Sequence, residues 1–117
     1  MTNGQTQTLS APVRVESEYR GPGCKYDWGY VIISVSPAES FSFKSIASWP
    51  AANYSGAVER GIIEGLTAAG YQPTLKAAFV LEDIKWHDVD STEHAFLLAG
   101  RRAAEKILNT GQVVNSA

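Results

Sequence analysis

The chain has 117 residues, of which 44% are hydrophobic and 19% are charged, and its formal net charge is -2. This length suits one small domain with a real core, and the composition is that of a folded globular protein rather than a disordered chain. The charge balance excludes a strongly basic protein that binds nucleic acid indiscriminately, but it allows a local basic edge.

Cysteine content and the N-terminal segment both indicate a cytoplasmic protein. The single cysteine, Cys24, can form no internal disulfide, so a disulfide-stapled secreted fold is not expected. Residues 1–12 are polar and lack the basic and apolar regions of a signal peptide. No apolar run approaches the roughly 20 residues that a membrane helix needs. We therefore expect a soluble chain with no membrane partner.

The first part of the chain predicts an arm followed by three strands. Residues 1–11 are rich in Thr, Gln, Asn and Ser, which indicates a loose N-terminal arm. Valines alternate with charged residues over 12–19, as in a half-buried strand. A loop with glycines and a proline at 20–29 leads to a β-branched strand at 30–36, and a third strand follows near 40–47. Their short connections predict an antiparallel meander.

A helix is expected over 53–69. Its apolar stripe consists of Val58, Ile62, Leu66 and Ala69, widened by Ile63. Gly61 and Gly65 lie on one face, and each costs ~1 kcal/mol relative to alanine. A close approach of the helix to the sheet would compensate for that cost. Gly70 suits the C-cap position.

The last part of the chain predicts one strand and one helix. The strand covers 75–84 and the helix 90–108, with Asp90 as the N-cap and Glu93 completing a capping box. The core-facing residues would be Phe96, Leu98, Ala99, Ala103 and Ile107, and the outer ones Arg101, Arg102, Glu105 and Lys106. The polar residues 109–117 are expected to form a frayed tail.

The order β-β-β-α-β-α predicts an α+β two-layer sandwich, in which a four-stranded sheet carries both helices on one face. We expect a single domain over residues 12–108, between the arm at 1–11 and the tail at 109–117.

The loop Trp86-His87-Asp88-Val89-Asp90 is chemically the most distinctive stretch. Histidine titrates near neutral pH, so acid–base chemistry is conceivable there. However, no nucleophile, oxyanion donor or cofactor motif accompanies His87, and no second cluster stands at metal-ligand spacing. We therefore expect no catalytic residue, metal or cofactor. A polar turn that binds no ligand is the structural alternative, because such residues are common in turns.

A second candidate is the loop that contains Arg20, Lys25, Tyr26 and Trp28. It combines two cations with two aromatic rings, which are the residue types that contact phosphates and stack on unpaired bases. The structural alternative is a simple hairpin connection.

The segment WHDVDSTEHAF at residues 86–96 resembles the YHDVDSSE-x-AF signature of domain IV of bacterial elongation factor G. In that family the loop lies at the tip of an elongated domain, which enters the decoding region of the small ribosomal subunit. It contacts tRNA and messenger RNA during translocation. The resemblance implies that His87 corresponds to the tip histidine, which is modified to diphthamide in the eukaryotic counterpart.

The loop at 20–29 is similar to the family's RQSGGRGQYGHVV, which forms the other tip loop. The matching residues are Arg20, Gly23, Lys25, Trp28 and Gly29. The chain departs from the glycine-rich run at Pro22, Cys24, Tyr26 and Asp27, and Asp27 adds a negative charge.

Two further segments extend the resemblance over about residues 12–108. Residues 53–62, NYSGAVERGI, resemble EYIPAVDKGI, and residues 69–73, AGYQP, resemble AGYPV. The resemblance also implies a left-handed β-α-β crossover, against the usual right-handed rule.

The sequence contains no G-x-x-x-x-G-K-[ST] phosphate loop, so GTP hydrolysis is not expected. An acid–base or metal enzyme ranks third, behind two hypotheses without catalysis. The leading hypothesis is a free-standing, non-enzymatic module that binds the small ribosomal subunit or structured RNA. Its contact residues would be Arg20, Lys25, Tyr26, Trp28, Trp86, His87 and Asp88. The alternative is a protein-interaction or self-association module, in which a protein partner or a second copy covers exposed apolar surface or a sheet edge.

Overall fold

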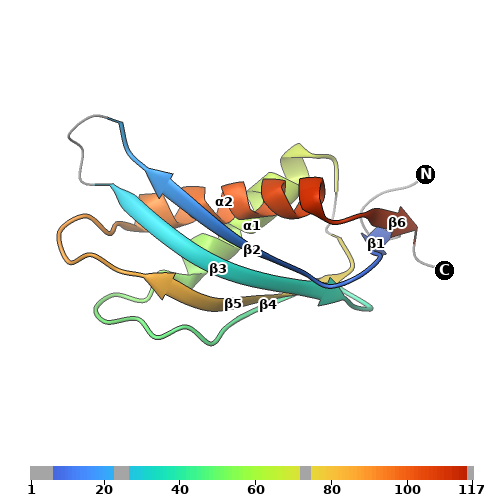
Figure 1. Cartoon of the computed structure of the whole chain (residues 1–117), viewed down its shortest axis with the longest axis horizontal. Coiled ribbons are helices and arrows are strands. Elements are labelled where there is room, and N and C mark those ends of the chain that lie inside the picture. The colour runs from blue at the N-terminus through green and yellow to red at the C-terminus, as the bar shows by residue number, and fades with distance from the viewer. Residues whose placement is uncertain (1–6, 23–26, 72–74, 116–117) are drawn as a thin grey trace.

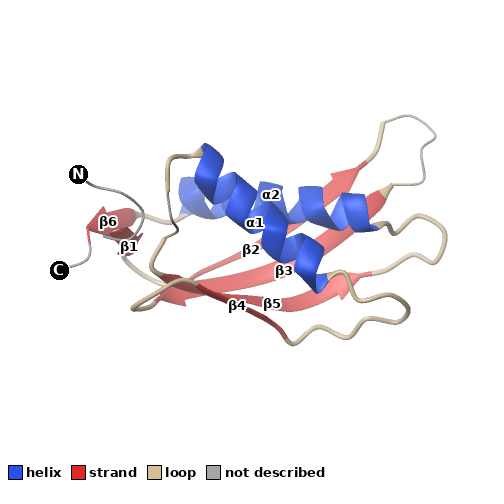
Figure 2. Ribbon diagram, turned by 180° about the vertical axis from the view of Figure 1, so that it is seen from behind, coloured by secondary structure: helices blue, strands red, loops and turns tan. Residues whose placement is uncertain are grey.

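The computed structural model describes residues 7–22, 27–71 and 75–115. Its elements are β1 (Gln7–Leu9), β2 (Val13–Arg20), β3 (Trp28–Pro37), β4 (Ser42–Ser45), α1 (Ser55–Ala68), β5 (Ala77–Lys85), α2 (Glu93–Thr110) and β6 (Val113–Asn115) (Figure 1). The main sheet has the order β2-β3-β5-β4, and both helices lie on one of its faces (Figure 2). The α+β two-layer sandwich is therefore confirmed. Within the described residues, neither helix is long and apolar enough to cross a membrane.

One strand of the predicted meander lies elsewhere. β2 and β3 pair antiparallel along the whole of β2, as expected. β4 does not pair with β3; it pairs in parallel with β5 at the far edge of the sheet. The longer β5 occupies the position between β3 and β4 because its alternate side chains are buried, whereas the short β4 carries the exposed Lys44 and suits an edge. The prediction of a three-stranded meander is wrong for that pair.

The crossover from β4 through α1 to β5 is left-handed. In Figure 2 the helices lie in front of the sheet, and β4 and β5 both run to the right. The chain passes from β4 at the lower edge, through α1 in front, to β5 above it. A right-handed connection seen from the helix side would move in the opposite direction. The handedness agrees with the elongation factor resemblance.

A second, two-stranded sheet joins the two ends of the described chain. β1 pairs antiparallel with β6, and Leu9 is only 1% exposed and belongs to the main core. The polar composition predicted a loose arm and a frayed tail, and this prediction is wrong for residues 7–9 and 113–115. The backbone groups of the two segments form hydrogen bonds with each other. Leu9 and Val113 supply apolar contacts with the core, which the polar composition of the surrounding residues did not indicate.

The two helices touch through glycines. A Cβ atom on Gly61 would lie 2.0 Å from the Leu97 carbonyl oxygen, and one on Gly100 would lie 2.5 Å from the Val58 carbonyl oxygen. The expectation that Gly61 and Gly65 approach the sheet is wrong, since both face α2. The larger buried side chains of α1 belong to the core shared with the strands, where the wider gap between layers needs bulk.

The end of α1 follows the sequence signal. Gly70 has a positive φ of 95°. Its amide donates to the Thr67 carbonyl at 3.0 Å, and the Tyr71 amide donates to the Leu66 carbonyl at 2.9 Å. These two bonds form a Schellman motif, in which glycine is favoured at the left-handed position. The predicted stop at Gly70 is confirmed.

Two glycine-to-alanine substitutions in α1 should have different effects. Gly61→Ala should lower the free energy of unfolding by about 1–3 kcal/mol or more, because the new methyl group meets the backbone of α2. Gly56→Ala, with nothing within 4 Å of the added Cβ, should be neutral or stabilising by up to about 1 kcal/mol. Denaturant unfolding of both variants checks this, and an equal change in both would contradict the close helix contact.

Candidate functional site

At the end of the sandwich that lies away from β1 and β6, the described end of the loop between β2 and β3 meets the loop between β5 and α2 (Figure 1). We call them the hairpin loop (residues 21–27, between β2 and β3) and the histidine loop (residues 86–92, between β5 and α2). The Trp28 amide donates to the Asp90 carbonyl at 2.8 Å, and Trp28 forms an isolated parallel bridge with Ser91. Residues about sixty positions apart in the sequence therefore share one surface.

Asp27 connects the hairpin loop to the beginning of α2. Its carboxylate accepts a hydrogen bond from the Thr92 hydroxyl, and its Oδ2 lies 3.0 Å from His94 Nδ1. The side chain is 21% exposed. A carboxylate is also favoured near a helix N-terminus, where amide dipoles converge. The negative charge that distinguishes this loop from the family pattern thus points toward α2.

The predicted N-cap at Asp90, with Glu93 as its capping-box partner, is wrong. The cap is Thr92, whose hydroxyl oxygen accepts a bond from the Ala95 amide at 3.0 Å. The preceding residues are committed to a closed turn, because the Ser91 amide donates to the His87 carbonyl and the His87 amide donates to the Ser91 hydroxyl, both at 2.9 Å. That turn delays the helix by two residues.

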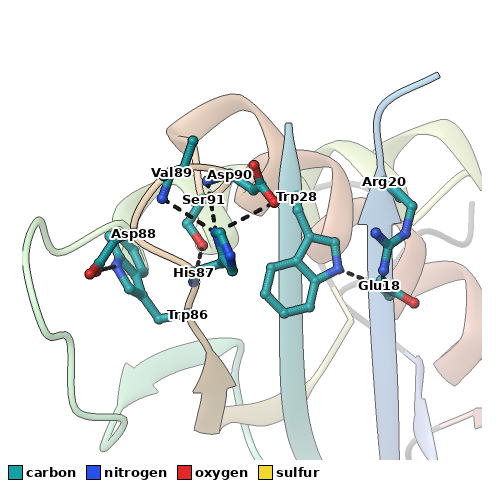
Figure 3. Close-up of polar contacts among 9 residues, drawn as sticks. All are labelled: Glu18, Arg20, Trp28, Trp86, His87, Asp88, Val89, Asp90 and Ser91. Carbon is teal, nitrogen blue, oxygen red and sulfur yellow. Dashed lines mark hydrogen bonds and ion pairs between the residues drawn. The ribbon is translucent and has the colours of Figure 1, made fainter. Parts of the chain in front are cut away.

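The His87 ring is oriented by the backbone of its own loop. The amides of Val89 and Asp90 both donate to His87 Nδ1, each at 3.3 Å (Figure 3). A ring nitrogen that accepts hydrogen bonds carries no proton, so the neutral ring has its proton on Nε2. Asp90 Oδ2 lies 3.4 Å from Nδ1, and this contact becomes an ion pair only when the ring is protonated. The side chain is 57% exposed, so Nε2 is the ring atom left to donate to a partner.

The histidine loop is anchored by a cluster of aromatic rings that includes its first residue, Trp86. Trp86 stacks on Phe96 with ring centroids 5.9 Å apart, and it meets Trp49 edge-on at 6.2 Å. Tyr54 completes the cluster. Trp86 also donates from Nε1 to the exposed Asp88 at 3.2 Å. Trp86 is therefore half-buried and anchors the loop, whereas Asp88 faces solvent. Trp49 and Tyr54 could not be assigned to this loop from sequence, because they come from the distant segment before α1.

Arg20 and Trp28 share one carboxylate on the other side of the tip. Glu18 Oε2 accepts bonds from Trp28 Nε1 and from Arg20 at 2.9 Å, and the guanidinium lies 5.8 Å from the Trp28 ring centroid (Figure 3). The hydrogen bond from Trp28, and then that from Arg20, lowers the pKa of Glu18. The remaining predicted contact residues, Lys25 and Tyr26, lie outside the described residues, as does Cys24.

In the part of the chain that the structure describes, no group of three or more His, Cys, Asp or Glu side chains could hold a metal ion. The histidine loop presents outward an imidazole donor on His87, a carboxylate acceptor on Asp88 and the exposed apolar side chain of Val89.

The tie between Asp27 and Thr92 makes a testable contribution to stability. Thr92→Ala should lower the free energy of unfolding by about 0.5–2 kcal/mol, because α2 loses its cap. Thr92→Ser retains the hydroxyl and should stay within about 0.5 kcal/mol of the native protein. A double-mutant cycle with Asp27→Ala should give a coupling energy of at least about 0.5 kcal/mol, and additive effects would show that the two loops are not tied through this pair.

Comparison with known proteins agrees with these features. The family model described as elongation factor G, domain IV, matches residues 5–112. Elongation factor G from Fervidobacterium nodosum is 30% identical over 117 residues, and that from Thermotoga petrophila is 29% identical over 119. Each match covers 92% of this chain and 17% of the relative, so the chain spans only a small part of the length of these relatives.

A crystal structure of a protein from Thermus thermophilus has the same fold. It matches with a TM-score of 0.80 at 23% identity, covering 93% of this chain and 17% of that one. Together with the family match over residues 5–112, the left-handed crossover and the paired tip loops lead to one assignment. The chain belongs to the elongation factor G domain IV family.

Proposed function

We propose that this chain is a ribosome-associated binding module that contacts RNA of the small subunit through the hairpin and histidine loops. The observation that supports this most directly is that the two loops are bonded to each other, through Trp28 to Asp90 and through Asp27 to Thr92. A binding surface whose parts are held together at Asp27 and Trp28 loses less conformational entropy when it meets a partner.

Each candidate contact residue has a role that suits RNA. His87 Nε2 donates to a phosphate oxygen or a base acceptor, and Asp88 accepts from a base amino group or a ribose 2′-hydroxyl. Arg20 and Lys25 supply charge to phosphates, and Tyr26 and Trp28 supply rings for stacking. Trp86 contributes by holding the histidine loop on the aromatic cluster.

This role is binding without catalysis. The 117 residues contain no phosphate loop, so nothing in them would hydrolyse GTP. In this proposal the module works in the cytoplasm, where translating ribosomes are found.

Self-association through the edge strand β2 is less well supported than RNA binding. Lys106 and Arg102 on α2 donate to the backbone carbonyls of Glu16 and Glu18 at 2.6 and 3.0 Å. These side chains already use acceptors that an added strand would need. A protein partner would instead be indicated by a failure of the chain to bind ribosomes.

The test is co-sedimentation of the purified chain with small subunits and whole ribosomes across a salt series. Pelleting should saturate and weaken with salt, because phosphate contacts release counterions. The double variant Lys25→Ala, His87→Ala should bind at least about tenfold more weakly, because hydrogen bonds to charged groups contribute roughly 1.5–3 kcal/mol.

The matched control is Lys44→Ala, Arg101→Ala, which removes two exposed cations on β4 and α2 and should pellet like the native chain. Equal binding by the native chain and the tip variant would disprove the site. Equal loss in both double variants would reduce the interaction to a general charge effect. No pelleting at low salt would overturn the proposed function and redirect the search to protein partners.

A further inference from the structure

The face of the sheet that the helices leave uncovered carries two aromatic rings next to the tip. Trp28 and Tyr30 are two residues apart on β3, so their side chains leave the same face. The alternate residues that follow them, Val31, Ile33 and Val35, point to the helix side and are at most 1% exposed. The two ring centroids lie 6.4 Å apart. Both rings are half-buried, which leaves part of each accessible from this face.

Acidic side chains of β2 hold both rings by their polar edges. Glu18 accepts a hydrogen bond from Trp28 Nε1, and Glu16 accepts one from the Tyr30 hydroxyl. The bond to Glu16 raises the pKa of Tyr30, so the phenol keeps its proton at neutral pH. The rings are thus oriented in advance, and their polar atoms are already engaged. What they can offer a ligand is their π surface.

A cation lies over each ring. Lys85 Nζ is 4.3 Å from the Tyr30 ring centroid, and the Arg20 guanidinium is 5.8 Å from that of Trp28. Arg20 also pairs with Glu18 at 2.9 Å. Among the residues that the structure describes, no carboxylate forms an ion pair with Lys85. Its ammonium can therefore move from the ring to a phosphate without breaking a salt bridge.

We infer that the open-face platform, composed of Arg20, Trp28, Tyr30 and Lys85, binds single-stranded RNA. This inference rests on the proposed function and extends it from the tip loops onto the sheet. Bases stack on the two rings, and the flanking phosphates contact Lys85 and Arg20. The strand must be single because paired bases do not expose their faces. The polar atoms of both rings are already hydrogen-bonded to Glu18 and Glu16. We therefore expect little sequence preference, because every base can stack on an aromatic ring.

The acids of the same face limit the electrostatic contribution. Glu16 and Glu18 lie beside the rings, and the two cations that lie over the rings are Lys85 and Arg20. Two phosphate contacts predict that the logarithm of the affinity falls with the logarithm of salt at a slope of about -1.4. The platform should therefore show weaker salt dependence than a basic groove does.

The test is fluorescence anisotropy of a labelled oligouridine of about ten nucleotides, within the range of known single-strand site sizes. Tyr30→Leu should weaken binding by about fivefold or more, because one stacking surface is lost. Tyr30→Phe retains the ring and should bind within about twofold of the native chain, which separates stacking from the hydroxyl bond to Glu16. Lys85→Ala should weaken binding and reduce the salt slope by about 0.7.

The control is Arg101→Ala, which removes an exposed cation from α2 on the opposite layer and should bind like the native chain. Thermal unfolding establishes that Tyr30→Leu is folded, and Lys85→Ala changes only an exposed side chain. Native-like binding by both Tyr30→Leu and Lys85→Ala overturns the platform. Preference for a double-stranded competitor, or an equal loss of oligonucleotide binding in Arg101→Ala, also overturns the platform.

The ribosome and oligonucleotide assays distinguish the two proposals. Oligonucleotide binding that depends on Tyr30, without ribosome pelleting, supports the platform and disproves the ribosomal role. Pelleting that depends on Lys25 and His87, without any oligonucleotide binding at low salt, supports the tip and overturns the platform.

Discussion

The position of α2 is fixed by three places where its backbone meets another backbone. Gly61 of α1 faces the Leu97 carbonyl, Gly100 of α2 faces Val58, and Gly29 of β3 would place a Cβ 2.8 Å from Ala95. Such contacts leave no room for a side chain and permit very little sliding. One helix is thereby held against both its neighbouring helix and the sheet.

The tip depends on this placement. Gly29 fixes the first turn of α2 beside β3, and the preceding residue, Trp28, bonds to the histidine loop just before that turn. Thr92 then serves two elements, as the cap of α2 and as the donor to Asp27. The geometry of Trp28 and the histidine loop is therefore set by packing in the core, and a substitution at Gly29 would shift them without altering any exposed residue.

Net charge describes this surface poorly. The chain is formally acidic at -2, yet the carboxylates near the tip are largely engaged by the protein itself. Glu18 holds Trp28 and Arg20, Asp27 holds Thr92 and His94, and Asp88 accepts from Trp86. These acids orient aromatic rings and loops. The charge of the side chains that remain available to a partner therefore cannot be inferred from the net charge of the chain.

The sequence by itself determined the features that depend on neighbours along the chain. The alternating valines of β2, the stop at Gly70 and the distinctive loop around His87 were all readable, because strand alternation, caps and turns are local. Only the tertiary structure decided the parallel partner of β4, the pairing of β1 with β6, the inward turn of Asp27 and the choice of Thr92 over Asp90 as the cap. The first three depend on contacts between distant segments, and the cap depends both on the turn between His87 and Ser91 and on the bond from Thr92 to the distant Asp27. No pattern of residue types along the chain records these energies.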